Sequence, residues 1–220
     1  MNWLPAVPWI RWAVLGVLAL VLVGGVAGAG WAWYSAQESR AREAFAQASE
    51  VVQLAQAPAP GTGAPAASPE ARARAIAALE VVLAQHPRAA IVPQAAYQLG
   101  NLRYADGQYP QARGAFEVAL AGGATGNLKA LCALGIAYTW EGQKDLGKAQ
   151  TAYEAALSGR GAKDFLYEEL LTDLARVQEF GGNPQAALAT YERLLKDVPD
   201  TRRADDIRSR IATLKSAEKK

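Results

Sequence analysis

Few residues in this 220-residue sequence could carry catalytic chemistry. Histidine is the usual general base and metal ligand near neutral pH, and the one histidine, His86, lies next to a proline at the expected end of a helix. The one cysteine, Cys132, falls within an expected helix, where a buried thiol is the simplest interpretation. The acidic pairs Glu168–Glu169 and Asp205–Asp206 are neighbours in sequence, so on a helix their side chains diverge and should be solvated. We therefore expect no enzyme, no metal site and no cofactor.

The glycines between Leu99 and Leu120, in the stretch LGNLRYADGQYPQARGAFEVAL, raise the alternative of a phosphate-binding loop. Such loops follow a β-strand, and the sequence contains no run of alternating β-branched residues that would predict one. A nucleic-acid partner is also disfavoured, because 23 basic and 21 acidic residues leave no marked basic surplus. A single cysteine excludes an intrachain disulfide, so the fold must rely on packing.

The same pattern of small and aromatic residues recurs along the chain. In its first copy, Ala112, Phe116 and Ala119 follow Gly100 on what would be a second helix. Recurrence after about 35 and then about 40 residues marks a structural repeat. The repeat positions are Leu99, Gly100, Ala112, Phe116 and Ala119 in the first copy, Leu134, Gly135, Tyr138, Ala149, Tyr153 and Ala156 in the second, and Leu174, Ala175, Ala187, Tyr191 and Pro199 in the third.

This spacing predicts helical hairpins that stack into a solenoid, so the expected fold class is all-α. A glycine on the first helix lets the second helix approach, and an aromatic residue on the second fills the gap to the next hairpin. The segment 143–148 is expected to form a longer turn than its counterparts. The expected turn residues are Asp106–Gly107, Glu141–Gly142 and Gly181–Gly182.

These residues resemble the tetratricopeptide repeat (TPR) family over roughly residues 70–199. A preceding hairpin is expected from a helix over 35–56 and a helix over 70–86, joined by the Pro/Ala/Gly linker 57–69. Residues 200–220 should form a capping helix with a charged tail. The resemblance implies a scaffold that binds other proteins on an extended surface.

The amino-terminal segment 1–34 is predicted to be a tail and a membrane anchor. No charged residue occurs from Trp12 to Gln37. Trp12 and Trp31 would be about 28 Å apart on a helix, close to the ~30 Å thickness of the hydrocarbon layer. Aromatic residues at both ends of the segment are typical of a spanning helix, and they also include Trp3, Trp9, Trp33 and Tyr34. The alternative is a cleaved signal peptide, since Ala27–Ala29 fits the small-x-small cleavage pattern.

Basic residues on the two sides of this segment nearly balance, so the charges do not determine its orientation in the membrane. A short amino-terminal tail that stays in the cytoplasm would place the repeats in the bacterial periplasm. Gly24 and Gly28 form a G-x-x-x-G pattern that can join two spanning helices as a homodimer. The whole plan resembles the single-pass ancillary subunits of the SecYEG translocon of the inner membrane. That resemblance implies the translocon or a periplasmic chaperone as partner. The alternatives are a self-associating envelope organiser or assembly factor, and a secreted periplasmic repeat protein.

In the TPR geometry, the first helices of successive hairpins line a concave groove. Residues three or four apart share one face of a helix, and exposed Tyr, Trp and Arg are common binding hot spots. The competing interpretation is that the aromatic residues only pack between hairpins. The groove residues are Gln94, Tyr97, Asn101 and Tyr104 on one helix, Lys129, Cys132, Ile136 and Trp140 on the next, and Thr172 and Arg176 on the third. Lys129 is too isolated to predict a carboxylate clamp.

Overall fold

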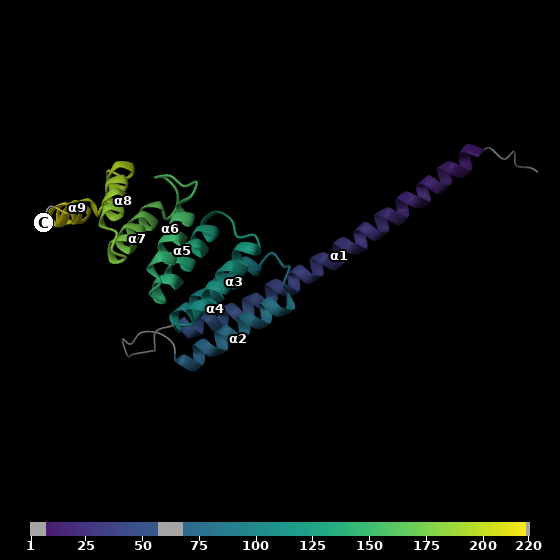
Figure 1. The fold of residues 1–220 in the computed structure, drawn as a ribbon. Helices are drawn as coiled ribbons and strands as arrows, with labels where there is room; N and C mark the ends of the chain where they lie inside the picture. Colours follow the sequence, from purple (N-terminus) through teal and green to yellow (C-terminus); the bar gives the residue numbers. More distant parts are fainter. Residues whose placement is uncertain (1–7, 57–67, 219–220) are drawn as a thin grey trace, which may run out of the picture.

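The computed structural model describes residues 8–56 and 68–218, and within these ranges every regular element is an α-helix (Figure 1). The all-α prediction is confirmed. Trp3 and most of the expected linker lie outside the described residues. The helices are α1 (Pro8–Gln56), α2 (Pro69–Gln85), α3 (Val92–Ala105), α4 (Tyr109–Ala121), α5 (Gly126–Gly142), α6 (Leu146–Leu157), α7 (Tyr167–Phe180), α8 (Pro184–Asp197) and α9 (Ala204–Glu218).

Consecutive helices pair as hairpins, and the hairpins stack one on the next (Figure 1). α3 packs on α4, α5 on α6 and α7 on α8, while the carboxy-terminal part of α1 packs on α2. Side chains from the preceding turn cap several helices: the Ser68 hydroxyl accepts the N–H of Ala71 at 3.2 Å, and the Asn183 side chain accepts that of Ala186 at 3.2 Å. α2 therefore begins at Pro69, the last residue of the expected linker.

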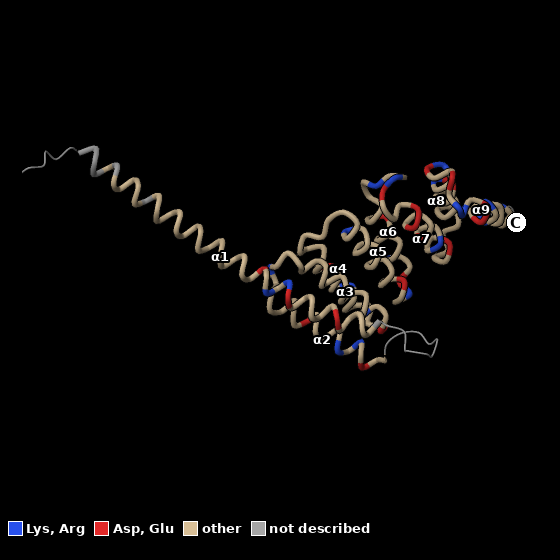
Figure 2. The backbone as a smooth tube through the Cα atoms, turned by 180° about the vertical axis from the view of Figure 1, so that it is seen from behind, with Lys and Arg blue, Asp and Glu red and all other residues tan. Residues whose placement is uncertain are grey.

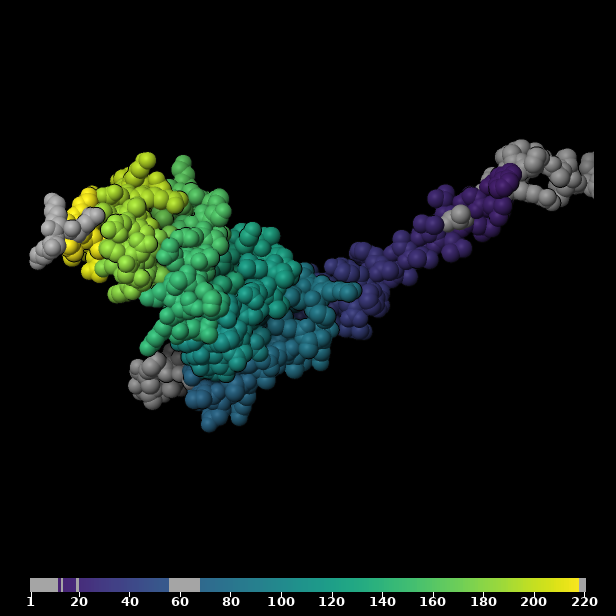
Figure 3. All heavy atoms as spheres, viewed as in Figure 1, coloured from purple at the N-terminus to yellow at the C-terminus, as the bar shows by residue number. Residues whose placement is uncertain are grey.

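α1 is one continuous helix with two different surroundings. Its carboxy-terminal part buries Ala41, Phe45, Ala48 and Val52, and this face packs against α2 around Leu79. Its amino-terminal part projects away from the other helices with no element beside it (Figure 3). α1 is long and apolar enough to cross a membrane. A signal sequence near an amino terminus has the same properties, so length and composition do not distinguish the two.

The ring of Phe116 occupies the space between two glycines on neighbouring first helices. A Cβ atom added to Gly100 on α3 would lie 2.5 Å from this ring, and one added to Gly135 on α5 would lie 2.7 Å from it. Phe116 is 1% exposed. Because neither glycine has a side chain, one aromatic ring fills both the hairpin α3–α4 and its junction with α5.

The connection between α5 and α6 differs from the expected longer turn. The turns after α3, α5 and α7 each contain three residues, and the extra residues of the second repeat instead lengthen α5. Gly142 is therefore helical and lies against the Tyr109 ring. A Cβ atom added to Gly142 would lie 2.4 Å from that ring. The left-handed position of this turn belongs to Lys144, with φ of 61°, where the other two turns use Gly107 and Gly182.

α9 closes the stack at its carboxy-terminal end. Ile207 and Leu214 are buried, and Ile211 packs beside them against the core of the last two hairpins. That core is centred on Tyr153 and Leu170, both fully buried. One side of α9 thus covers an apolar surface that would otherwise face water.

Candidate partner-binding surface

The four predicted groove residues of α3 have different surroundings. Gln94 and Asn101 are exposed, so their amide groups are available to a ligand. Tyr97 is half-buried, with its ring centroid 5.9 Å from that of Phe116. Tyr104 is 36% exposed, and its ring lies 6.4 Å from that of Tyr138 on α5. Tyr97 therefore packs within the solenoid, whereas Gln94 and Asn101 face solvent.

Two predicted residues of α5 line one hollow between α5 and α6, which we call the α5–α6 hollow. It has a volume of about 700 Å³. Ile136 and three alanines of α6 form apolar walls, while Lys129 is exposed and contributes positive charge. Arg160 lies in the connection from α6 to α7 and adds a second cation, anchored by a 2.8 Å hydrogen bond from its Nε to the carbonyl oxygen of Ala156.

Trp140 is held between two cationic side chains rather than lying free on the surface. The guanidinium of Arg113 on α4 lies 3.5 Å from the centroid of the indole ring, and the Lys148 ammonium on α6 lies 4.5 Å from it. Cation–π contacts of this kind contribute about 0.5–2 kcal/mol each. The indole therefore links α4, α5 and α6.

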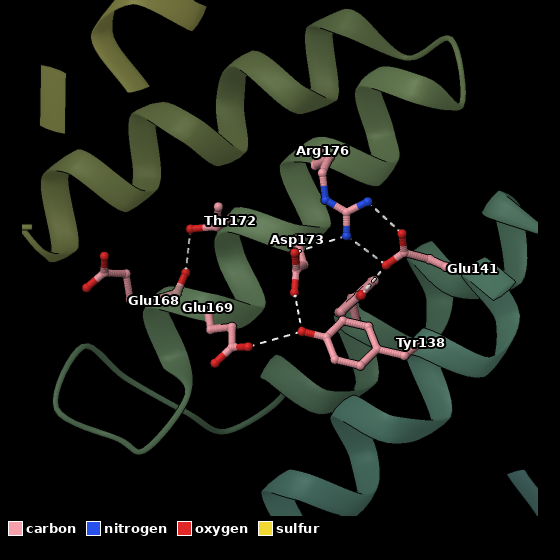
Figure 4. Close-up of polar contacts among 8 residues, drawn as sticks. Tyr138, Glu141, Glu168, Glu169, Thr172, Asp173 and Arg176 are labelled. Atoms are coloured by element: carbon pink, nitrogen blue, oxygen red, sulfur yellow. Dashed lines mark hydrogen bonds and ion pairs between the residues drawn. The ribbon is translucent and has the colours of Figure 1, made fainter. Parts of the chain in front are cut away.

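Arg176 on α7 is engaged by two carboxylates (Figure 4). Its two terminal nitrogens donate to the two oxygens of Glu141 on α5 at 2.6 and 2.9 Å, and one of them also donates to Asp173 at 3.0 Å. A bidentate pair of this kind is strong and directional. The guanidinium thus joins the second hairpin to the third, and its hydrogen bonds are directed inside the protein rather than at a ligand.

The same cluster contains two tyrosines that the sequence pattern assigned to packing. The Tyr138 hydroxyl donates to Asp173 at 2.9 Å and to Glu169 at 3.0 Å, and the Tyr153 hydroxyl donates to Glu141. Burial raises the pKa of both hydroxyls far above the usual value, with the neighbouring carboxylates adding to it. The expectation that Glu168–Glu169 form a solvated face is wrong, because Glu168 also accepts a hydrogen bond from Thr201.

Cys132 lies in the core beside Phe116 and is completely buried. It therefore cannot take part in the groove. Burial raises the pKa of its thiol to about 11, so the thiol is protonated at neutral pH. Thr172 is half-buried, and its hydroxyl donates to the carbonyl oxygen of Glu168 within α7. Among the residues that the structure describes, no cluster of His, Cys, Asp and Glu could hold a metal ion.

The structure brings only four of the predicted residues together, in two pairs. Lys129 and Ile136 share the α5–α6 hollow, while Tyr104 and Arg176 lie at the polar cluster of α5 and α7. Sequence reasoning missed Arg160 and the carboxylates of the cluster. One signal was present, since Glu141 and Arg176 are opposite charges one repeat length apart on consecutive first helices.

One hairpin of the stack, formed by α7 and α8, matches a known repeat family. A tetratricopeptide repeat family model matches residues 169–201, which cover most of α7 and all of α8. The fold is a tetratricopeptide-repeat solenoid. The matched repeat is the third of those predicted from the sequence, and it has Ala175 where the first two copies have Gly100 and Gly135.

Solved TPR structures share this fold at low sequence identity. YrrB, described as a TPR protein with an unusual peptide-binding site, has 17% identity and a TM-score of 0.51, over 68% of this chain and 71% of that one. A tetratricopeptide repeat protein from Parabacteroides merdae has 14% identity and a TM-score of 0.61, over 80% of this chain and 60% of that one. A search among curated proteins finds no match. A TPR fold implies a scaffold for protein–protein interaction.

Proposed function

We propose that this chain is a membrane-anchored scaffold of the bacterial inner membrane, whose repeats hold a protein partner in the periplasm. The observation that carries the proposal is the continuity of α1, in which a single helix joins an uncovered apolar segment to the first hairpin of the solenoid. The repeats support the second half of the proposal, because stacked hairpins present an extended surface for protein binding.

The apolar part of α1 has the dimensions of a bilayer. From Trp12 to Trp33 the helix rises about 31 Å, against ~30 Å for a hydrocarbon layer. Its large apolar side chains are uncovered, and Trp12, Leu20 and Trp31 remain 75%, 73% and 73% exposed. Exposing apolar surface to water costs about 25 cal/mol per Å², whereas lipid chains would cover it. Figure 2 shows this part of α1 free of charged residues up to its junction with the repeats.

Retention of the segment would keep the anchor and the first hairpin on one helix. α1 passes through Ala27–Ala29 without a break and continues to Gln56. Gly24 and Gly28 have no neighbouring atom within 4 Å of an added Cβ atom, so this face is open to a second copy of the helix. We include in the proposal a homodimer that forms through these glycines. Crosslinking of the full chain would test it.

For the partner, we propose the α5–α6 hollow as the docking site. Apolar walls around Ile136 suit a buried side chain, and the two cations Lys129 and Arg160, against the one acidic lining residue Asp164, suit a neighbouring acidic group. A peptide segment is the class of ligand that we propose, since YrrB carries a peptide-binding site on the same fold. The SecYEG translocon and periplasmic chaperones are the partners to test first, because the plan of the chain resembles the translocon's ancillary subunits.

Affinity purification of the detergent-solubilised full-length protein tests this proposal. The variants Lys129→Ala and Lys129→Glu change an exposed lining residue of the α5–α6 hollow, so each should reduce partner capture while the melting temperature stays unchanged. Arg208→Ala, at an exposed ion pair on α9, is the matched control and should capture normally. Wild-type capture by both test variants, or a loss of capture that only follows a loss of thermal stability, would remove this surface from the binding site.

A further inference from the structure

A second hollow lies where α1 leaves the repeats, and we call it the junction hollow. It has a volume of about 570 Å³. One wall is α1, with Trp33 and Tyr34 followed by Gln37 and Glu38, and the other is the connection from α2 to α3 over residues 85–89. It therefore combines two aromatic rings with a polar loop that carries Arg88.

The position of the junction hollow along α1 places it at the level of lipid headgroups, provided that the proposed anchor spans the membrane. Trp33 and Tyr34 are at the end of the apolar segment, where aromatic residues mark the boundary of the hydrocarbon layer. From Tyr34 to Glu38 the helix rises about 6 Å. The headgroup layer on each side is about 5–7 Å thick, since a bilayer of ~40–45 Å has a core of ~30 Å. The loop beside Glu38 thus occupies that layer.

The carboxylate of Glu38, the acidic group of the junction hollow, joins the loop to α1 through a hydrogen bond. Oε2 of Glu38 accepts the backbone N–H of Ala90 at 3.2 Å, and its Oε1 lies 3.6 Å from Nε of Arg42. The Glu38 side chain is only 11% exposed. The ion-pair partner of Glu38 is therefore Arg42, one helical turn further along α1, and Oε1 accepts no hydrogen bond among the described residues.

Arg88 is the strong cation of the junction hollow. It is exposed, and no ion pair engages it among the residues that the structure describes. A guanidinium binds phosphate through paired hydrogen bonds. An unpaired guanidinium beside interfacial aromatic rings, at headgroup depth, matches the chemistry of a phospholipid.

We propose that the junction hollow binds the phosphate headgroup of an anionic phospholipid. Arg88 contacts the phosphate, and Trp33 and Tyr34 pack against the glycerol and the upper acyl chains. This inference rests on the proposed anchoring of α1. Because the loop is also hydrogen-bonded to Glu38, the bound lipid would hold the first hairpin at the membrane surface and fix the direction in which the repeats extend from it.

Spin-labelled lipids test this site in the full-length protein. The chain is reconstituted in phosphatidylcholine vesicles with a trace of spin-labelled phosphatidylglycerol or spin-labelled phosphatidylcholine, and electron paramagnetic resonance measures the motionally restricted fraction of each. We expect phosphatidylglycerol to associate about fivefold more strongly, the ratio equivalent to the ~1 kcal/mol that one basic residue contributes at an anionic surface. Arg88→Glu should abolish that preference. Arg202→Glu makes the same charge change at an exposed residue beyond α8 and should preserve it.

The possible outcomes separate the two proposals. A wild-type protein that alkaline carbonate strips from the vesicles contradicts the anchoring of α1 itself. A protein that stays inserted but restricts both lipids equally, or that keeps its preference after Arg88→Glu, overturns the lipid site alone. An equal loss of preference in Arg88→Glu and Arg202→Glu also overturns it, because the effect would then be one of overall charge.

Discussion

Arg176 and Glu141 form a bidentate ion pair that joins α7 to α5 across the boundary between two hairpins. The pair depends on the length of α5, because Glu141 lies in the part of α5 that extends past the ends of its counterparts α3 and α7. The extra residues of the second repeat therefore supply a carboxylate that both Arg176 and Tyr153 use. This contact adds a polar link between the second and third hairpins to their apolar packing.

Replacing Arg176 by alanine should destabilise the solenoid. The change leaves the carboxylates of Glu141 and Asp173 close together without their shared cation. Since the Arg176 side chain is 38% exposed, water compensates in part, and we expect a loss of about 1–2 kcal/mol in the free energy of unfolding.

Urea unfolding of a fragment beginning at residue 35 measures this change. We expect the fragment to be soluble, mainly helical by circular dichroism, and unaffected by chelator or reductant. The control Arg208→Ala removes an exposed ion pair with Asp205 and should change stability by less than about 0.5 kcal/mol. Equal small effects of the two substitutions would show that the interhairpin pair contributes nothing.

Phe116 and its two glycines allow a test of the junction between the first two full hairpins. Phe116→Ala should cost about 3–5 kcal/mol, the usual effect of truncating a buried phenylalanine. Gly135→Ala should cost about 1–3 kcal/mol, because the new methyl group meets the Phe116 ring. Gly114→Ala, on α4 with open space at its Cβ position, should instead stabilise by about 0.5–1 kcal/mol. A stabilising Gly135→Ala would mean that Phe116 does not fill this junction.

Lys144 should be a strained position that glycine relieves. Its φ of 61° is in the left-handed region, which costs a residue with a side chain about 1–2 kcal/mol. Lys144→Gly should therefore raise the free energy of unfolding by about 1 kcal/mol, while the reverse change in the equivalent turn, Gly107→Lys, should lower it by a similar amount. Thermal melts of both variants check the pair. A destabilised Lys144→Gly would show that the lysine side chain outweighs the backbone strain.

The tyrosines of the polar cluster predict a loss of stability in alkali. The pKa of Tyr153 is raised in the folded protein by burial and by Glu141, so above pH ~10 the unfolded chain releases a proton that the folded chain keeps. The free energy of unfolding must then fall with rising pH, by up to ~1.4 kcal/mol per pH unit for one such group. Urea titrations from pH 8 to about 11 should show a shallower fall for Tyr153→Phe than for wild type. Identical slopes would place the hydroxyl in solvent.

Local spacing was enough to predict the hairpins. Gly100 and Phe116 are sixteen residues apart, and only a short turn between two helices brings such a pair into contact. The repeat could therefore be predicted from residue types and their spacing. The sequence misled at the second turn, where Gly142 resembled a turn glycine. A glycine can serve either a left-handed turn or a close helix contact, and here the Tyr109 ring determines which.

The polar cluster could not be predicted in the same way. Whether Arg176 meets Glu141 depends on the rotation and rise of α7 relative to α5, and both follow from packing over several helices. Arg113 on Trp140 is a similar case, because it is a contact between side chains that no short-range pattern links. The sequence pattern therefore assigns Arg176 and Trp140 to the groove, whereas in the structure each of them contacts a charged side chain of another hairpin.

Under the proposed function, α1 stays on the mature protein and anchors the repeats in the membrane. Intact mass spectrometry of the protein extracted from carbonate-washed bacterial membranes tests it most directly. We expect a carbonate-resistant protein whose mass includes the apolar segment through Tyr34. A mature protein that begins at Gly30 and is found in the soluble periplasmic fraction would contradict it.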